Sequence, residues 1–261
     1  MMSFIIQTVL PFILSALIVI IITIIAEKYG TKVGGILGTL PSTIIIAFIF
    51  ISINKDVSFA SRSAAVVPAE MAINLVFLVI VSTLAYRSLS FALVVSLGIW
   101  GVLTTALYFS DITNIFISII LYALSLIFCF IYLEKIRKIE SHKKVKVHYT
   151  KKKIVLRGIL AGTVISTAVF FSNINSTLSG IFSIFPAIFL STMIITYLEH
   201  GPVFTSGFAK SMIFGSQTVM SYVIAVHFLY PKFGLFYGTI YSFLISLVVA
   251  MILLKLRKKI I

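Results

Sequence analysis

Runs of about 20 apolar residues recur along the whole chain and restrict its possible folds more than any other feature. A helix of about that length crosses the hydrocarbon core of a bilayer, and in lipid its backbone groups must bond to one another. Only 11% of the residues are charged, against about 25% in a typical soluble domain. The sequence therefore predicts an all-α, polytopic transmembrane helical bundle.

Polar breaks divide the apolar runs into about nine expected transmembrane helices. The first apolar run has no basic residues before it and no small-residue cleavage site after it, so we expect it to be retained rather than removed as a signal peptide. The expected spans are residues 4–25, 33–53, 62–85, 88–109, 112–133, 155–173, 177–198, 206–229 and 233–255.

The longest polar insertion, "EKIRKIESHKKVKVHYTKKK" (134–153), predicts the orientation of the chain. It carries nine of the 21 Lys and Arg residues, so we expect a cytoplasmic loop in contact with anionic lipid headgroups. Alternating the spans from this loop places 18 basic residues inside and three outside, namely Lys55, Arg62 and Lys232. This bias predicts a cell-membrane protein with its N-terminus outside and its C-terminus cytoplasmic, and nothing in it requires nucleic acid as a partner.

Two segments 145 residues apart share a pattern of glycine and proline. "GILGTLPST" (35–43) and "GIFSIFPAIFLST" (180–192) both place a proline six residues after a glycine, inside an expected span. Four spans on each side of a single span would form an inverted-topology repeat, as in many secondary transporters. The predicted organisation is a first four-helix repeat (1–110), a connecting helix (111–133), a basic cytoplasmic loop (134–154) and a second four-helix repeat (155–261).

Residues 180–217, "GIFSIFPAIFLSTMIITYLEHGPVFTSGFAKSMIFGSQ", resemble the GlpM family of small bacterial inner-membrane proteins. The shared features are a glycine, then Phe-Pro, an apolar half-helix, a short loop with an acid and a glycine, and a helix ending near "FG". The segment "GGILGTLPSTIIIAFIF" follows the same plan but lacks the "FG" element. The resemblance implies two GlpM-like units in opposite orientations, and it implies topology rather than a reaction.

Interrupted helices at matching places in two repeats indicate a binding site near the membrane midplane. The alternative is that glycine and proline there only allow helices to pack closely. On the first interpretation the substrate path is lined by residues with exposed backbone groups or small polar side chains: Gly35, Gly38, Pro41, Ser42, Thr43, Gly180, Ser183 and Pro186.

Glu70 is the one acid expected well inside a span, with Asn74 one turn further on the same helical face. An acid near the bilayer centre costs about 2.5–3.5 kcal/mol on insertion scales, so it usually faces a partner or a cavity. We therefore expect a protonatable or cation-binding carboxylate on the path. The alternative is that the third span starts nearer residue 70 and that Glu70 is interfacial.

A polar stripe on the expected eighth span adds Gln217 and Ser221 to the candidate path. Lys210 begins this span, and we expect its side chain to extend to the cytoplasmic edge. Trp100 is expected to anchor or pack at an interface. The histidines are not spaced as a metal site, and Cys129 is expected to be an inert buried thiol.

No sequence signature of a hydrolase, metalloprotease or nucleotide-binding loop is present, so we expect neither an enzyme nor a cofactor. The predicted function is transport of an unknown small solute, by secondary transport or as a channel, with a homo-oligomer possible. A second hypothesis is a non-transporting membrane protein that binds a lipid-linked or protein partner. A third is a lipid translocator, which would have a polar groove open to the bilayer.

Overall fold

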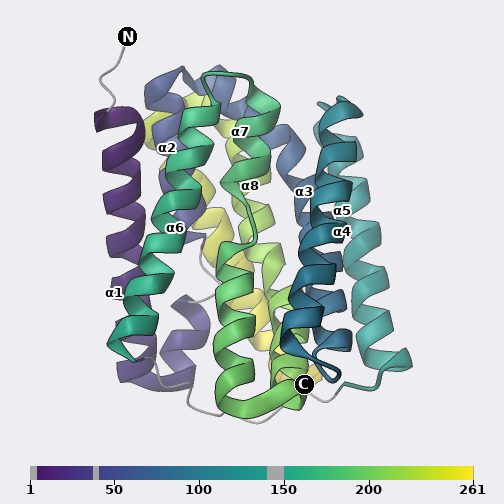
Figure 1. Cartoon of the computed structure of the whole chain (residues 1–261). Coiled ribbons are helices and arrows are strands. Elements are labelled where there is room, and N and C mark those ends of the chain that lie inside the picture. The colour runs from purple at the N-terminus through teal and green to yellow at the C-terminus, as the bar shows by residue number, and fades with distance from the viewer. Residues whose placement is uncertain (1–4, 38–40, 140–149, 261) are drawn as a thin grey trace.

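The computed structural model describes residues 5–37, 41–139 and 150–260, and these form an elongated bundle of helices (Figure 1). Two short π-helices, η1 and η2, cover Ile5–Val9 and Tyr132–Ile136. The α-helices are α1 (Leu10–Leu37), α2 (Ser42–Asn54), α3 (Val57–Leu84), α4 (Leu89–Phe109), α5 (Ile115–Ile131), α6 (Lys151–Phe171), α7 (Ser176–Ser183) and α8 (Ala187–Ile260).

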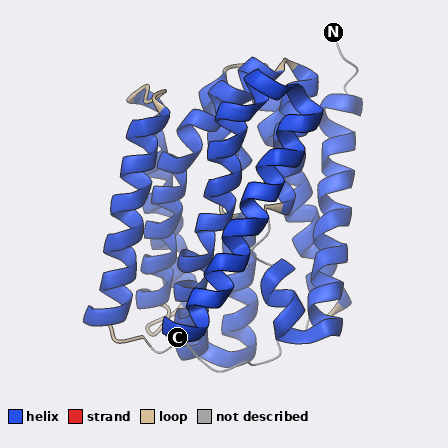
Figure 2. Ribbon diagram, turned by 180° about the vertical axis from the view of Figure 1, so that it is seen from behind, coloured by secondary structure: helices blue, strands red, loops and turns tan. Residues whose placement is uncertain are grey.

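The predicted all-α class is confirmed, because the described residues contain helices and turns and no strand (Figure 2). The predicted number of nine helices is not confirmed. Six helical segments among the described residues are long and apolar enough to cross a membrane. The 13-residue α2 and the eight-residue α7 are shorter than a bilayer requires. The break expected between residues 25 and 33 is also absent, because α1 continues to Leu37.

The longest element, α8, contains two of the expected boundaries without a loop. Gly201 and Gly234 have φ values of 74° and 69°, which L-residues with side chains rarely adopt. Pro202 directly follows the first of them, where its missing N–H does not interrupt a helix that is just beginning. The chain therefore changes direction at each glycine, and α8 consists of three helical segments: 187–200, 202–233 and 235–260.

Several helices start where the sequence supplies a capping side chain. Asp56 accepts a hydrogen bond from the Phe59 N–H at 2.7 Å, and Asn175 accepts one from the Leu178 N–H at 2.8 Å. Each side chain satisfies a backbone donor that has no partner within the first turn of the helix. Because Asp56 caps α3, this helix starts five residues earlier than the expected residue 62.

Helix α3 forms the centre of the bundle, packed against α4, α5, α7 and α8. Its buried residues lie on all sides of the helix, as expected for an element surrounded by others. A second close contact joins α1 to α6, where a Cβ on Gly162 would lie 2.7 Å from the Phe12 carbonyl oxygen. Small residues at this contact allow the two backbones to approach closely, as is common in membranes.

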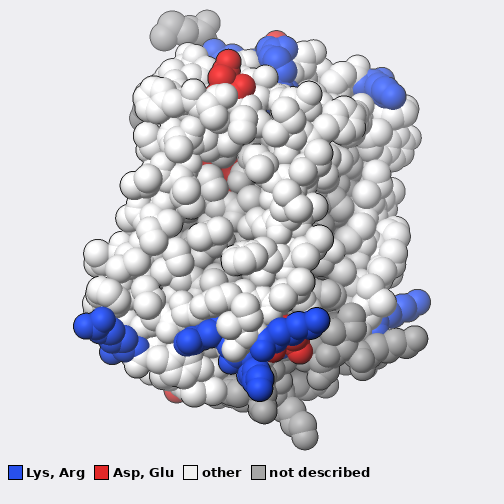
Figure 3. Space-filling view, turned by 90° about the vertical axis from the view of Figure 1, so that its right-hand side faces the viewer, with Lys and Arg blue, Asp and Glu red and all other residues white. Residues whose placement is uncertain are grey.

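Charged side chains gather at the two ends of the molecule (Figure 3). On the face that Figure 3 shows, the long surface between them is almost entirely uncharged, apart from a small acidic area. Apolar side chains such as those of Val94, Ile120 and Phe128 are exposed on the outer helices. An apolar belt between two charged ends is the surface of a multi-pass membrane protein. The start of α1 and the end of α8 lie at opposite ends of the bundle (Figure 1).

Candidate functional site

The central helix α3 carries two fully buried polar side chains, Glu70 and Asn74, both with 0% exposure. Glu70 lies 13 residues after Val57, the first residue of this 28-residue helix, so it is near the middle. The helix thus begins well before residue 70, rather than near it as the interfacial alternative for Glu70 supposed. At 1.5 Å per residue, Glu70 lies about 20 Å from the start of α3.

The Glu70 carboxylate accepts a hydrogen bond from a hydroxyl group. Thr104 of α4 donates to Glu70 through its Oγ1, with distances of 2.9 Å to Oε1 and 3.2 Å to Oε2. The ion pairs found among the described residues involve Glu134 and Glu199, and none involves Glu70. An ionised carboxylate at such a position, without a cation, would incur an effective desolvation penalty of several kcal/mol. Glu70 therefore requires either a proton or a bound cation.

Asn74 connects α3 to two other elements. Its Nδ2 donates to the Ile184 carbonyl oxygen at 2.8 Å, and its Oδ1 accepts from the Trp100 Nε1 at 3.0 Å. Trp100 lies one turn before Thr104 on α4, and its ring meets that of Phe185 edge to face at 4.9 Å. Glu70, Asn74, Trp100, Thr104 and the backbone of residue 184 thus form one cluster, which we call the α3–α4–α7 junction.

The backbone at this junction is not helical. Helix α7 ends at Ser183 and α8 starts at Ala187, so residues 184–186 connect two half-helices. The Ile184 carbonyl, freed from the helix pattern, accepts the hydrogen bond from Asn74. Pro186 is buried at this break, as expected for a proline that interrupts a helix. The predicted interruption near Pro186 thus lies beside the predicted Glu70 and Asn74.

Gly180 allows α7 to lie directly against α3. A Cβ at this position would be 2.2 Å from the Ser63 carbonyl oxygen and 2.6 Å from the Val66 side chain. Ser183, one turn later, is also buried and its hydroxyl donates to the Gly180 carbonyl oxygen at 2.6 Å. Gly180 therefore packs the half-helix against α3, which is the close-packing interpretation of the glycine.

The first interrupted segment is described only in part. Pro41 is buried before the first turn of α2, and Ser42 and Thr43 begin that helix half-buried. Gly35 lies within α1, and Gly38 lies outside the described residues. Helix α2 packs against α6, α7 and α8, and it occupies the same end of the bundle as α7 (Figure 1).

The polar stripe expected on the eighth span is not part of the junction. Gln217 and Ser221 donate to carbonyl oxygens of their own helix, at Phe214 and Thr218. The expected extension of Lys210 to the cytoplasmic edge stays a prediction, and the structure adds partners for its charge. Its side chain is 5% exposed, forms an ion pair with Glu134 and donates to the Ile139 carbonyl oxygen at 2.8 Å. Lys210 thereby attaches α8 to the segment that follows α5.

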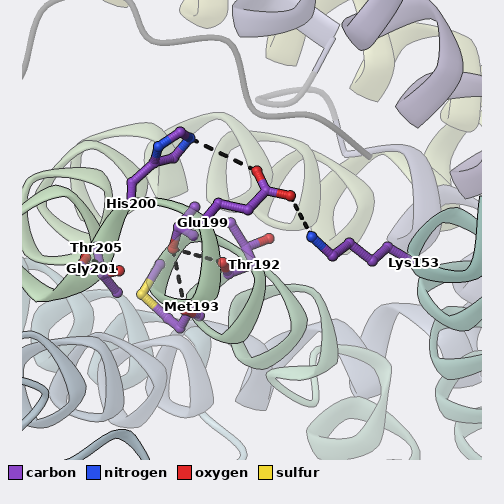
Figure 4. A network of polar contacts seen from close by, with 8 residues as sticks. Lys153, Thr192, Met193, Glu199, His200, Gly201 and Thr205 are labelled. Carbon is purple, nitrogen blue, oxygen red and sulfur yellow. Dashed lines mark hydrogen bonds and ion pairs between the residues drawn. The ribbon is translucent and has the colours of Figure 1, made fainter. Parts of the chain in front are cut away.

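A second polar cluster lies at the end of the first segment of α8 (Figure 4). Glu199 lies between Lys153 of α6, with which it forms an ion pair, and His200, whose Nε2 is 3.8 Å from Glu199 Oε2. Gly201, where α8 changes direction, directly follows. We call Lys153, Glu199 and His200 the α6–α8 cluster. It fixes α6 to α8 just before the turn.

Sequence reasoning missed Trp100 and Thr104 as members of the junction. Each lies on α4, and they are four residues apart, as Glu70 and Asn74 are on α3. Two polar pairs with this spacing on neighbouring spans can face each other along the helices. That shared spacing is the signal that could have identified them.

Comparisons with known proteins give a partial similarity to one family and no activity. Residues 154–259, which include most of α6, all of α7 and nearly all of α8, match the model of DUF3147, a family of proteins of unknown function. Among curated proteins and solved structures, none matches the chain. These comparisons support neither the GlpM resemblance nor the internal repeat.

Proposed function

We propose that this protein is a transporter or channel for a small solute, and not an enzyme, with its path at the interface of two inverted repeats. The observation that carries the proposal is the α3–α4–α7 junction. A buried acid there lies beside the interrupted backbone of residues 184–186. Interrupted helices and ionisable residues at membrane depth are the usual components of transport sites.

Helix boundaries support the repeat. Helices α2 and α8 begin at residues 42 and 187, and 187 − 42 = 145. Helix α3 begins at residue 57, and the second segment of α8 begins at residue 202, again 145 residues later. Helix α4 begins at residue 89 and the third segment of α8 follows Gly234, which is residue 89 + 145. The same spacing relates the glycines and prolines on which the GlpM-like plan of both halves rests.

A pair of hydrogen bonds also supports the repeat. Ser61 donates to the His227 carbonyl oxygen at 2.7 Å, and Ser206 donates to the Ser82 carbonyl oxygen at 2.6 Å. Adding 145 to 61 gives 206, and adding 145 to 82 gives 227. Each half therefore donates from one position and accepts at the other, as a pseudo-twofold axis between the halves requires.

The proposed orientation places the N-terminus outside and the C-terminus in the cytoplasm of a cell-membrane protein. The excess of Lys and Arg in 134–153 and at the C-terminus supports this orientation. In this arrangement the basic loop contacts anionic headgroups, although residues 140–149 lie outside the described part of the chain. The proposed unit is a single chain or a homo-oligomer.

The runner-up is a non-transporting membrane protein that binds a lipid-linked or protein partner. It is favoured by the full burial of Glu70 and Asn74, which are packed among neighbouring side chains. A transporter would hold these groups occluded in this state and expose them in another, because such transitions take microseconds to seconds. The two proposals therefore differ in whether the junction ever meets water.

Cysteine accessibility in sealed vesicles tests this difference. In a Cys129→Ala background, Ser42→Cys, Glu70→Cys, Ser183→Cys and Gln217→Cys are treated for minutes with a membrane-impermeant thiol reagent. Transport predicts labelling at positions 42, 70 and 183 on this timescale.

Two control positions give the labelling expected for a fully accessible cysteine and for an inaccessible one. Ser110→Cys, in an exposed turn, should label fully, and Ile120→Cys, on the apolar surface of α5, should not label. Silence at all four test positions, with Ser110→Cys labelled, would remove the transport proposal in favour of the binding protein.

A further inference from the structure

The carboxylate of Glu70 lacks a countercharge because the elements around α3 supply none at its depth. Helices α2, α4, α5 and α7 contain no Asp, Glu, Lys, Arg or His within their bounds. Their titratable side chains are Tyr108, Tyr122 and Cys129, whose partners are Asn175, Ser216 and Ser125. A cation for Glu70 would therefore have to come from α8 or from a ligand.

The cationic groups of α8 are engaged elsewhere. Lys210 is held by Glu134 and Ile139 at one end of the bundle. His227 lies toward the other end, where its Nδ1 is 2.8 Å from the Ser61 carbonyl oxygen. Lys232, Lys255 and the basic residues 257–259 lie close to the ends of their helical segments, and His200 belongs to the α6–α8 cluster. Among the described residues, the charge of Glu70 is thus left for a ligand to balance.

Aromatic rings adjoin the carboxylate. Trp100 donates a hydrogen bond to Asn74, which lies one turn from Glu70 on α3. The ring of Trp100 contacts that of Phe185. Phe182 stacks on Phe185 with the ring centres 6.4 Å apart, and Phe171 meets Phe182 at 4.5 Å. These four side chains are all partly exposed, whereas Glu70 is not. They form a row of rings that leads from the surface to the junction.

We propose that the α3–α4–α7 junction binds an organic monocation with an aromatic or apolar body, in exchange for one proton on Glu70. The proposal rests on the proposed function in taking Glu70 as a group on the path. The cation's charge would pair with the carboxylate while its body lies against the rings of Trp100 and Phe185, since aromatic faces attract cations. The balance is one proton released from the Glu70 carboxyl for each cation bound, so the charge of the occupied site is unchanged.

An inorganic cation fits the junction less well. Alkali and alkaline-earth ions need several oxygen ligands, and calcium takes six to eight. The Asn74 oxygen is occupied by Trp100 and the Ile184 oxygen by Asn74, so the free acceptors belong mainly to Glu70 itself. No cluster of three or more potential metal ligands occurs among the described side chains. One carboxylate beside several rings is a site for a large, weakly hydrated cation.

The test uses the purified full-length protein and tetraphenylphosphonium chloride as the probe. Equilibrium dialysis gives the bound probe, and a pH indicator in weak buffer gives the protons released. Trp100 is the single tryptophan of the chain, so its fluorescence reports directly on the junction. We expect saturable binding, a saturable change in Trp100 emission, and one proton released per probe bound.

Variants assign the effect to the carboxylate. Glu70→Gln should release no protons and bind the probe at least tenfold more weakly. Glu70→Asp retains the acid on a shorter side chain, so it should still release protons but bind the probe with lower affinity. This variant replaces Glu70→Gln as the test if Glu70→Gln does not fold. Glu199→Gln alters an acid of the α6–α8 cluster, away from the junction, and should bind and release as the unmodified protein does.

Four results would overturn the proposal: no saturable binding, binding without proton release, unchanged binding in Glu70→Gln, or equal proton release by sodium chloride alone. Labelling at positions 42, 70 and 183 together with no probe binding would support the transport proposal and contradict the proposal that the ligand is an organic cation. Probe binding with proton release but no labelling would support the cation site at Glu70 and contradict the transport proposal.

Discussion

The α3–α4–α7 junction and the α6–α8 cluster hold the same chemical group, a glutamate carboxylate, in opposite surroundings. Glu199 is partly exposed near the end of a helical segment and has a lysine and a histidine beside it. Glu70 is fully buried near the middle of its helix and accepts a hydrogen bond from the Thr104 hydroxyl. The charge of Glu199 is thus balanced by Lys153, whereas Glu70 has no cation beside it among the described residues.

This difference indicates that the charge of Glu199 has a structural role and that the charge of Glu70 has a functional one. An ion pair at a partly solvated end contributes little stability but fixes geometry. A central acid without a cation would be disfavoured by the bilayer environment, so its presence is explained by a proton or ligand that it binds. The following changes break or sharpen the contrast, in decreasing order of expected effect.

Gly180→Val should have the largest effect, because it separates α7 from α3 and removes the packing that forms the junction. The added side chain would begin 2.2 Å from the Ser63 carbonyl oxygen, a backbone atom that cannot move alone. We expect a loss of about 3 kcal/mol or more in the free energy of unfolding. Thermal unfolding in detergent measures it.

Gly101→Val is the matched control for this change. A Cβ at Gly101 meets nothing within 4 Å, although the residue also lies within a helix. We expect its unfolding temperature to stay within a few degrees of the unmodified protein. Equal unfolding temperatures for both variants would show that the α3–α7 contact is looser than described.

Asn74→Leu should weaken the junction without adding bulk. The change leaves the Ile184 carbonyl and the Trp100 Nε1 without their hydrogen bonds. Each buried group left unsatisfied costs about 1–3 kcal/mol. We expect lower thermal stability and a shift in Trp100 emission to shorter wavelength. Asn173→Leu, at an exposed position, is the control and should change neither property.

Ser61→Ala and Ser206→Ala compare the two proposed repeats away from the central charge. Each removes one hydroxyl that donates across the bundle, to His227 or to Ser82. We expect similar losses of about 0.6–1 kcal/mol for both, because the two bonds are equivalent under the proposed symmetry. Chemical unfolding measures both. A loss in one variant alone would contradict the equivalence of the two halves.

Lys153→Gln and Glu199→Gln should have the smallest effects. Both side chains of this ion pair are partly exposed, and such pairs contribute about 0–1 kcal/mol. Because salt screens exposed charges, the loss should shrink further at high ionic strength. A double-mutant cycle at low and high salt measures the coupling. A coupling of several kcal/mol that salt does not reduce would place Glu199 in the same class as Glu70.

The sequence by itself determined the class of the protein and the position of its unusual acid. Long apolar runs require helices in a membrane, because only internal bonding satisfies a backbone in lipid. The spacing of four residues was sufficient to place Glu70 and Asn74 on one face, since helical periodicity is local. Pro186 marked the interruption correctly for the same reason, because a proline breaks a helix through its own ring.

The tertiary structure alone decided which groups these residues meet. Trp100 and Thr104 are 26 and 34 residues from their partners, and Ile184 is 110 residues from Asn74, so no local pattern connects them. The same reason explains why the pairing of Lys210 with Glu134, which belongs to another element, was not expected. Both interpretations of Gly180, substrate path and close packing, were open from the sequence; the structure shows its contact with α3, because contact between helices depends on their three-dimensional arrangement rather than on either sequence. Periodicity fixes which face of a helix a residue occupies, and only packing fixes what that face contacts.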